Sequence, residues 1–565
     1  MLSVSNLSIK FGDSLALQNL SFSLKKGESL GFVGESGSGK SITALALMGL
    51  LPKNAKLVSG EASLQIPDSG ETFNLLEIDE KTHRTFRGNH LSMVFQEPMT
   101  SLNPSMRCGK QVCESIILHQ GVTKEKAREA CLKLFGEMQL PNPEKVFRSY
   151  PHELSGGQKQ RVMIAMALAG NPSILIADEP TTALDVTVQK GIILLLKKLV
   201  ANRGLSLIFI SHDLGVISQV TNRIIVLKEG QLVEEGTCDS IFNSPKHPYT
   251  KGLLMCKPPL NVRPQKLTTV SDFIETSDQH LEVEVISTEQ RTEQNGRIYS
   301  ASPILEVKDV VVEYTLKRNL VGKPSKSFRA VNKVNLNLYQ GETLGLVGES
   351  GCGKSSLGRA IIGLTQTENG TISYLRKEVG RMKSHELASF RKQVQLIFQD
   401  PYSSLNPRHT IGEAIMEPIK FHKLAKTESE VKQKAISLIE QVSLPTDSFY
   451  RYPHEFSGGQ RQRVAIARAL ALNPKVIICD EMVSALDVSV QAQILNLLNQ
   501  LKHDLGLTYI FISHDLSVVK YMSNRVLIMK SGELVESGDP DEIFQNPQTE
   551  YTKNLIDSIP QIRKT

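Results

Sequence analysis

Two glycine-rich stretches in this chain have the residue types and spacing that hold the phosphates of a nucleotide. They read GESGSGKS at Gly34–Ser41 and GESGCGKS at Gly348–Ser355. Each lies between an apolar stretch that predicts a strand and one that predicts a helix, so backbone N–H groups and the helix N-terminus can surround an anion. Lys40 and Lys354 are predicted to reach the β- and γ-phosphates. The predicted phosphate-binding residues are Gly34, Glu35, Ser36, Gly37, Ser38, Gly39, Lys40 and Ser41 in the first half, and Gly348, Glu349, Ser350, Gly351, Cys352, Gly353, Lys354 and Ser355 in the second.

Each half also carries two adjacent carboxylates at the end of an apolar run, Asp178-Glu179 and Asp480-Glu481. Ligands of parallel sheets bind at the carboxyl ends of the strands. We therefore expect the aspartate, together with Ser41 or Ser355, to hold Mg²⁺, and the glutamate to polarise the water that attacks a phosphate. A solvated turn and a solvated strand end are the alternatives for these motifs, and the recurrence of both motifs in one chain disfavours them.

The candidate residues recur at a nearly constant spacing. The two copies of SGGQ, at Ser155–Gln158 and Ser457–Gln460, lie 302 positions apart, and the same spacing separates His212 from His514. A repeat of this length is a whole domain and not a solenoid unit. Two related domains in tandem are therefore predicted.

The chain is predicted to divide into a first domain at 1–259, a linker at 260–303 and a second domain at 304–565. The linker is rich in Thr, Ser, Glu and Gln, so we expect it to be mostly solvated, with a short strand at Leu281–Val285 as an option. The first half holds 11 more residues than the second between its phosphate-loop lysine and the next matched glutamine. A surface hairpin or loop at Pro52–Gly70 is predicted to contain them.

Short apolar runs must position these residues. Continuous apolar sequence at 174–177 and 207–210, and again at 476–479 and 509–512, predicts central strands covered on both faces. Thr123 predicts the N-cap of a helix whose apolar residues recur at spacings of three and four.

Composition excludes several classes of protein. With 65 Lys and Arg against 59 Asp and Glu, the formal charge of +6 favours a mixed solvated surface over a nucleic-acid footprint. The seven cysteines show no CxxC spacing, so a reduced compartment is expected in place of a disulfide framework. No apolar run is long enough to predict a membrane span, and the N-terminus shows no secretory signal. Any membrane contact is therefore expected to come through another polypeptide.

The complete motif set resembles the ATP-binding cassette (ABC) ATPases over nearly all of both halves. The resemblance implies an α/β fold class: two tandem P-loop ABC ATPase domains, each with a mostly parallel core sheet, an antiparallel β subdomain and a helical subdomain. It implies that SGGQ opens a helix capping the γ-phosphate held by the opposite domain, that a glutamine senses Mg²⁺ and water, and that a histidine acts as a switch. The residues so assigned are Ser155, Gly156, Gly157, Gln158, Ser457, Gly458, Gly459 and Gln460 (signature), Gln96 and Gln399 (sensor), and Glu179, His212, Glu481 and His514 (catalysis). The implied Mg²⁺ ligands are Ser41, Gln96, Asp178, Ser355, Gln399 and Asp480.

Less specific positions follow from the same resemblance. Ala183–Asp185 and Ala485–Asp487 resemble the loop that links the two sites. Phe11 and Tyr314 are the candidates for stacking on adenine, and Phe328 is the alternative in the second half. At Cys352 the first half has a serine; packing is the expected role of the cysteine, with redox regulation as the alternative for a thiol near a helix N-terminus.

Longer strings resemble the oligopeptide/dipeptide/nickel importer branch of that family. They include YPHELS at Tyr150–Ser155, YPHEFS at Tyr452–Ser457 and HPYT at His247–Thr250. The resemblance implies the motor subunit of an importer for peptides or related small solutes, with ATP and Mg²⁺ as cofactors. It also implies two integral-membrane permease subunits and an extracytoplasmic solute-binding protein as partners, at the cytoplasmic face of the inner membrane. Only Cys238 and Cys256 lie near the C-terminal extension, so an iron–sulfur site is not expected.

A second hypothesis is a soluble tandem ABC ATPase that acts on ribosomes. That role favours a basic linker because ribosomal RNA is polyanionic, and the Glu- and Thr-rich linker disfavours it. A DNA-repair ATPase calls for zinc-spaced cysteines, which the sequence lacks. A tandem sugar importer is distinguished only by the longer strings.

Overall fold

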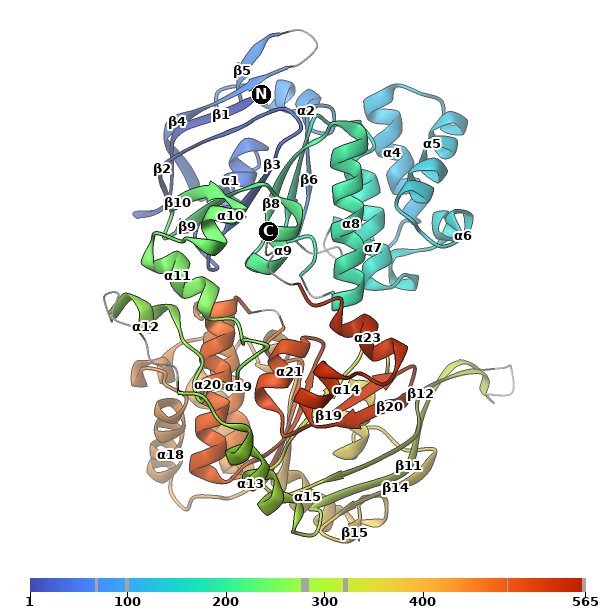
Figure 1. The fold of residues 1–565 in the computed structure, drawn as a ribbon, viewed down its shortest axis with the longest axis vertical. Helices are drawn as coiled ribbons and strands as arrows, with labels where there is room; N and C mark the ends of the chain where they lie inside the picture. The colour runs from blue at the N-terminus through green and yellow to red at the C-terminus, as the bar shows by residue number, and fades with distance from the viewer. Residues whose placement is uncertain are drawn as a thin grey trace.

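Each half of the chain builds two β-sheets and a set of helices, and the two halves stack along the long axis of the molecule (Figure 1). The computed structural model describes residues 1–66, 70–96, 101–182, 184–275, 284–318, 324–484 and 486–560. The first half, blue to green, lies above the second, and the C-terminus reaches back to the first half. The predicted α/β architecture with two tandem domains is confirmed.

The core of each half is a six-stranded sheet that is parallel except for one edge strand. The orders β6-β7-β8-β3-β9-β10 and β16-β17-β18-β13-β19-β20 correspond strand by strand. The strands are β3 (Ser29–Val33), β6 (Leu91–Val94), β7 (Ile174–Asp178), β8 (Ser206–Ile210), β9 (Arg223–Lys228) and β10 (Gln231–Thr237), and β13 (Thr343–Val347), β16 (Val394–Ile397), β17 (Val476–Asp480), β18 (Thr508–Ser513), β19 (Arg525–Lys530) and β20 (Glu533–Gly538). Every residue of β7, β8, β17 and β18 is buried, as continuous apolar sequence predicts.

A four-stranded antiparallel sheet covers one face of each parallel sheet. The orders are β2-β1-β4-β5 and β12-β11-β14-β15. The strands are β1 (Leu2–Phe11), β2 (Ser14–Leu24), β4 (Ala55–Gln65) and β5 (Thr72–Asn74), and β11 (Leu305–Arg318), β12 (Pro324–Leu338), β14 (Asn369–Tyr374) and β15 (Lys377–Glu378). Buried apolar side chains of both sheets form one cluster in each half. This packing fixes the loop between β3 and the following helix, where the phosphate-loop residues lie.

Helices lie on both faces of each parallel sheet, and part of them form a helical subdomain. In the first half they are α1 (Lys40–Leu47), α2 (Glu80–Phe86), α4 (Cys108–Gln120), α5 (Lys124–Glu137), α6 (Pro143–Arg148), α7 (Gly156–Ala167), α8 (Val186–Arg203), α9 (Leu214–Val220), α10 (Cys238–Asn243) and α11 (Pro248–Met255). In the second half they are α14 (Lys354–Ile361), α15 (Ser384–Gln393), α16 (Pro401–Ser404), α17 (Ile411–Phe421), α18 (Glu428–Gln441), α19 (Gly458–Leu470), α20 (Val488–Leu505), α21 (Leu516–Met522), α22 (Pro540–Gln545) and α23 (Glu550–Ile556). Thr123 caps α5 as predicted, since its side chain accepts from the Lys126 backbone N–H.

The inserted residues of the first half lengthen a hairpin. Strand β4 has 11 residues where its counterpart β14 has 6, and β4 turns into β5 near the edge of the sheet. The predicted surface hairpin at Pro52–Gly70 is confirmed for its described part, and residues 67–69 lie outside it.

The linker differs from the solvated segment that its composition predicts. It contains α12 (Val270–Glu275) and α13 (Thr288–Tyr299). Helix α12 packs against α11 of the first half, while Arg263 and Leu267 form hydrogen bonds with the second half. Arg291 is 8% exposed and pairs with Asp539 and Asp541 beside α22. Buried ion pairs of this kind can order a polar segment that has little apolar surface. Residues 281–283 of the suggested strand lie outside the described part, and Val285 forms an isolated bridge with Pro264.

One buried apolar cluster continues from the helices of the first half into those of the second. Among its members are Leu253 of α11, Val270 of α12 and Leu555 of α23. Because the core is continuous, the two halves are held against each other by more than the linker. No helix in the described part of the chain is long and apolar enough to cross a membrane.

Candidate active sites

Each phosphate loop folds around its own lysine. Lys40 begins α1 and is 5% exposed, and its Nζ donates to the carbonyl oxygens of Gly34 and Glu35, both at 2.8 Å. Lys354 repeats this arrangement at 2.7 and 2.9 Å, so the two loops have the same shape. Gly34 has a φ of +154°, and a Cβ there would lie 2.1 Å from a backbone oxygen of β9. Only glycine fits that turn.

The serine after each lysine meets the aspartate that ends the neighbouring strand. Ser41 Oγ lies 3.0 Å from Asp178 Oδ1, and Ser355 Oγ lies 2.8 Å from Asp480 Oδ1. Burial raises the pKa of Asp178 to about 6, and that of Asp480 is also raised. A hydroxyl and a buried carboxylate form a set of hard oxygen donors that suits Mg²⁺.

Three side chains converge on Glu179 in the first site. Its Oε2 accepts from Gln96 Nε2 at 3.1 Å and Thr182 Oγ1 at 2.8 Å, and it lies 3.2 Å from His212 Nδ1. Burial alone would raise the pKa of Glu179, but the His212 hydrogen bond and charge outweigh it and lower that pKa to about 2. Glu179 has a φ of +46°, which is strained for a residue with a side chain. The backbone conformation thus turns the charged Glu179 carboxylate toward Gln96 and His212.

The second site repeats the convergence with one difference. Glu481 Oε2 lies 3.1 Å from Gln399 Nε2 and 3.3 Å from His514 Nδ1. Where the first site has the Thr182 hydroxyl, the second has an ion pair of 3.6 Å between Lys354 and Glu481 Oε1. The predicted catalytic residues therefore come together in both halves, although their partners are not identical.

The SGGQ motifs begin helices α7 and α19, as predicted. Ser155 and Ser457 are the N-caps, and each forms a reciprocal capping box with the glutamine three residues later. A Cβ on Gly157 would lie 2.4 Å from Val188 Cγ1 of α8, so this glycine permits close packing of the two helices. The first residues of each motif, Ser155 and Gly156, and Ser457 and Gly458, are exposed, so an anion can approach the helix N-terminus.

The loops that follow the acidic pairs reach across to the opposite phosphate loop. The Ser36 N–H donates to Asp487 Oδ2 at 2.9 Å, and the Ser350 N–H donates to Asp185 Oδ2 at 3.4 Å. Thr187 adds a bond of 2.9 Å to Glu349. Each predicted site is therefore built from both halves. Ala183 and Ala485 of these loops lie outside the described residues.

A cavity of about 310 Å³ lies over the second phosphate loop. Tyr314 and Phe328 both line it, and they face each other across β11 and β12. Both aromatic candidates for adenine stacking thus remain. Among the described residues that line the cavity, none belongs to the first half, so the opposite SGGQ does not close it here. Phe11 ends β1, at the position matched by Tyr314 on β11.

Cys352 is buried within the second phosphate loop, 3.8 Å from Lys354 Nζ. Burial raises the pKa of its thiol, which the lysine only partly offsets. A protonated, buried thiol favours the packing interpretation over the redox alternative.

The C-terminal extension of each half supplies a contact that sequence reasoning missed. The Glu35 N–H donates to the Tyr249 hydroxyl of α11 at 3.0 Å, and the Glu349 N–H donates to the Tyr551 hydroxyl of α23 at 3.1 Å. Both tyrosines lie on helices far from the loops in sequence. The available signal was their recurrence at the common spacing of 302 positions.

We expect Tyr249→Phe and Tyr551→Phe each to raise the KM for ATP about fivefold, because the phosphate-loop N–H then lacks its buried acceptor. The catalytic rate constant is expected to change little, since neither hydroxyl forms a hydrogen bond with Glu179 or Glu481, the predicted catalytic glutamates. Steady-state ATPase assays measure both constants, and Tyr450→Phe, at an exposed tyrosine, is the control. An unchanged KM in both variants would show that the contact does not shape the loop.

Comparison with known proteins agrees with this geometry. The sequence model of the ABC transporter family matches residues 17–182 and 331–484. The chain belongs to the ABC transporter family. A second match, the C-terminal region of oligopeptide/dipeptide transporters, covers residues 233–277 and 535–565, which include the two tyrosine-bearing helices. The ABC cassettes and their extensions thus occur twice in one chain.

Relatives match over the whole length. Glutathione import ATP-binding proteins GsiA of Escherichia coli (strain K12) and of Shigella dysenteriae serotype 1 are each 45% identical to 99% of this chain, which covers 89% of their length. A solved dimeric ATP-binding cassette in a post-hydrolysis state, bound to ADP and Pi, is 29% identical, covering 42% of this chain and 98% of that chain with a TM-score of 0.38. The predicted family branch, ATPase activity and function as an importer motor subunit are confirmed. Nothing supports the ribosome-acting alternative. The roles of individual site residues stay predictions.

Proposed function

We propose that this chain powers the uptake of glutathione or a related short peptide through a pair of permease subunits. The observation that carries this proposal is the pairing of two complete ATP sites, each joined to the other half through Asp185 or Asp487, with the extension of the peptide branch after each cassette. The relatives named for glutathione import support the class of cargo.

The proposed roles in the first site follow from the contacts. Lys40 neutralises the phosphates, and the exposed N-terminus of α19 approaches the γ-phosphate when the halves close. Glu179 orients and polarises the attacking water, while Gln96 and His212 hold that carboxylate in place. Lys354, Glu481, Gln399 and His514 take these roles in the second site. Because SGGQ does not line the second cavity here, ATP binding must draw the halves together, and hydrolysis would release them.

Mg²⁺ fits the predicted sites. Ser41 and Asp178, and equally Ser355 and Asp480, bring a hydroxyl and a carboxylate oxygen together beside the phosphate loop. A bound cation would favour the charged form of aspartates whose pKa burial raises. When bound there, it would neutralise charge on the terminal phosphates.

Attachment to the membrane is proposed to run through the loops after Gln96 and Gln399. The segments Met99–Pro104 and Tyr402–Pro407 resemble the surface through which ATPases of this family dock on their permeases. In the second half this loop borders a cavity of about 410 Å³, which Ser404, Asn406 and Arg468 help to line. Residues 97–100 lie outside the described part. A concave surface on the loop that follows the predicted sensor glutamine in sequence suits a partner that must respond to the nucleotide.

Introducing charge into both loops, as Ser101→Glu with Ser404→Glu, is expected to abolish uptake and release the protein from permease-containing membranes. Carboxylates desolvated in a docked interface, without cations opposite, repel the partner. Sedimentation with membranes and uptake of labelled glutathione measure this, with basal ATP binding unchanged. The control is Ser3→Glu with Ser300→Glu, at two exposed serines outside these loops. Normal uptake in the loop variant would move the docking site elsewhere.

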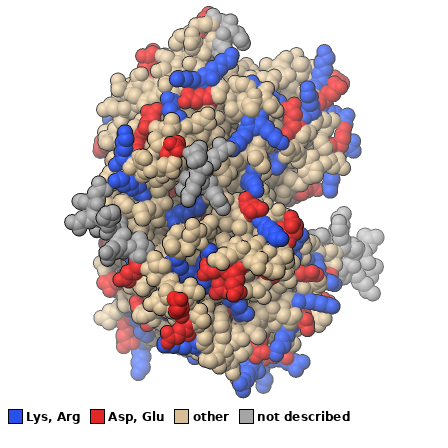
Figure 2. All heavy atoms as spheres, viewed as in Figure 1, with Lys and Arg blue, Asp and Glu red and all other residues tan. Residues whose placement is uncertain are grey.

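The same sedimentation assay distinguishes the importer proposal from the ribosome hypothesis. On the face shown in Figure 2, Lys and Arg side chains are interspersed with Asp and Glu, so that face presents no extended basic area for RNA. The wild-type protein is expected to sediment with membranes that hold its permeases and not with ribosomes. The reverse distribution would overturn the importer proposal.

A further inference from the structure

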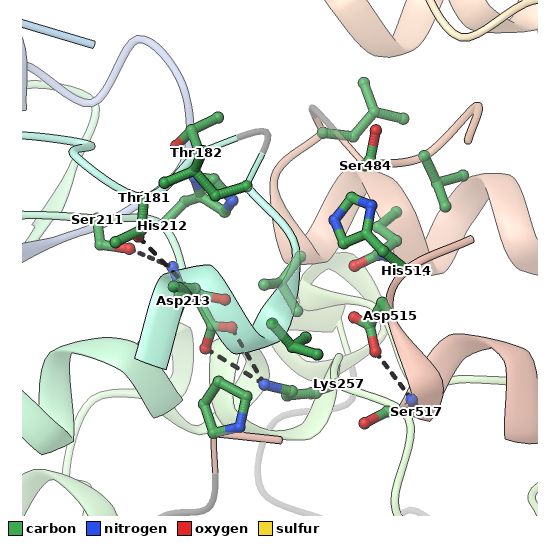
Figure 3. A pocket seen from close by; sticks show the side chains of 18 of the residues that line it. Thr181, Thr182, Ser211, His212, Asp213, Lys257, Ser484, His514, Asp515 and Ser517 are labelled. Carbon is green, nitrogen blue, oxygen red and sulfur yellow. Dashed lines mark hydrogen bonds and ion pairs between the residues drawn. The ribbon is translucent and has the colours of Figure 1, made fainter. Parts of the chain in front are cut away.

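A lysine of the first C-terminal extension lies at the centre of the interface between the halves. Lys257 follows α11 and lines a cavity of about 90 Å³ whose walls include His212, Asp213, His514 and Asp515. Figure 3 shows these side chains converging from both halves. The Lys257 Nζ lies 3.1 Å from Asp213 Oδ2 and 3.3 Å from Asp213 Oδ1, so the pair is a two-point charge-assisted contact.

Through Asp213, this contact connects Lys257 to the predicted catalytic residues of the first site. Asp213 caps α9 by accepting from the backbone N–H groups of Gly215 and Val216, at 2.7 and 3.4 Å. The residue before it is His212, whose Nδ1 lies 3.2 Å from Glu179 Oε2. A lysine that fixes Asp213 therefore fixes the start of α9 and the histidine beside it.

The second half lacks this lysine. The residue 302 positions after Lys257 is Ile559, which is 6% exposed and lines the same cavity. Asp515 nevertheless caps α21 in the same way, accepting from Ser517 N–H at 2.8 Å and Val518 N–H at 3.3 Å. Asp515 thus caps its helix without a lysine from its own extension.

The Lys257 ammonium group is only partly buried, with 27% of the side chain exposed, and a partly exposed ion pair contributes little stability. Its partial desolvation opposes the attraction of the carboxylate, so replacing such an ion pair with apolar groups is often neutral or stabilising. The chain itself makes that replacement at Ile559. Burial alone would lower the pKa of Lys257, but the charges of Asp213 and, more weakly, Asp515 raise it, so the lysine stays charged. Stability alone therefore does not explain why the first half keeps a lysine here.

We propose that Lys257 is a positioning residue that holds the His212 loop of the first site ready for hydrolysis and makes the two ATP sites unequal. It acts through Asp213 and leaves the second site, which has Ile559, without such a hold. Residues of both halves surround it: the Asp515 charge faces it, and Ile559 and Pro560 of the second half line the same cavity. The inference rests on the proposed catalytic roles of His212 and Glu179.

The test measures each site separately in the full-length protein. Wild type and Lys257→Ile, which copies the second half, are incubated with Mg²⁺, 8-azido-ATP and vanadate and then irradiated. Mass spectrometry of the labelled peptides reports the nucleotide trapped in each half. We expect label in the first half to fall roughly fivefold or more and label in the second half to change less than about twofold. Binding of 8-azido-ATP without vanadate should stay the same in both halves.

Three further variants and a thermal melting curve distinguish the loss of the Lys257 charge from a loss of folding. Lys257→Arg retains the charge and should restore most of the first-half label, whereas Lys257→Gln, the substitute if the isoleucine variant does not fold, should lose it. Lys246→Met, at an exposed lysine of the same extension, should behave as wild type. Equal loss in both halves, or a normal ratio in a folded Lys257→Ile protein, overturns the inference. Absence of trapping in either half of the wild type would instead overturn the proposed catalytic roles.

Discussion

Replacing both Glu179 and Glu481 with Gln is expected to slow ATP hydrolysis by about 100-fold or more while ATP still binds. Glutamine keeps the shape and one oxygen acceptor, so the contacts with the sensor glutamine and the switch histidine can persist. It lacks the negative charge that polarises water, which the surroundings maintain by lowering the pKa of both glutamates. Steady-state phosphate release and equilibrium nucleotide binding measure the two effects.

The double variant should also accumulate ATP in a closed form, since the nucleotide that draws the halves together is not consumed. Glu129→Gln with Glu440→Gln, at exposed positions on α5 and α18, is the matched control and should hydrolyse at the wild-type rate. A loss of ATP affinity in the Glu179/Glu481 variant, as large as that caused by removing a phosphate-loop lysine, would contradict the assignment of these carboxylates to hydrolysis.

The sequence predicts this constellation well because local rules fix most of it. Continuous apolar runs determine β7 and β17, and their ends place Asp178 and Asp480 at the carboxyl edge of the sheet. Ser155 and Ser457 cap helices by contacts within three residues. Such features depend on neighbours in the chain, and the recurrence of the motifs removes the ambiguity that a single copy leaves.

Long-range partners are what the sequence does not predict. The Tyr249 hydroxyl meets the first phosphate loop, and the Lys257 ammonium meets Asp213, only because the fold brings α11 and the residues after it next to these loops. The ordering of the linker through Arg291 likewise depends on Asp539 and Asp541, about 250 residues away along the chain. Composition describes the average solvation of a segment, and a few buried ion pairs can override it.

The two sites differ in the partners of their glutamates, although their motifs are nearly the same. Thr182 donates to the side chain of Glu179, whereas Ser484 donates to the backbone oxygen of Glu481. Lys354 pairs with Glu481 in the second site only, among the described ion pairs. Since both loops keep their lysine, aspartate and glutamate, we expect two active sites with unequal rates and not one active and one passive site.

Replacing Lys40 and Lys354 with Ala separates these possibilities. Each ammonium group is buried at 5% exposure or less, where water does not screen its attraction to phosphate, and its loss leaves the loop carbonyls without their donor. Each single variant is expected to lose roughly tenfold or more in ATPase activity, and the double variant about 100-fold or more. Lys198→Ala, at an exposed lysine of α8, is the control.

Because Asp185 and Asp487 tie each site to the opposite loop, one empty site should also slow the intact one. The ATPase activity of each single variant should therefore fall below half of the wild-type rate. Full activity in Lys354→Ala would show that the second site is a passive remnant, and activity near half in both singles would show that the two sites turn over independently.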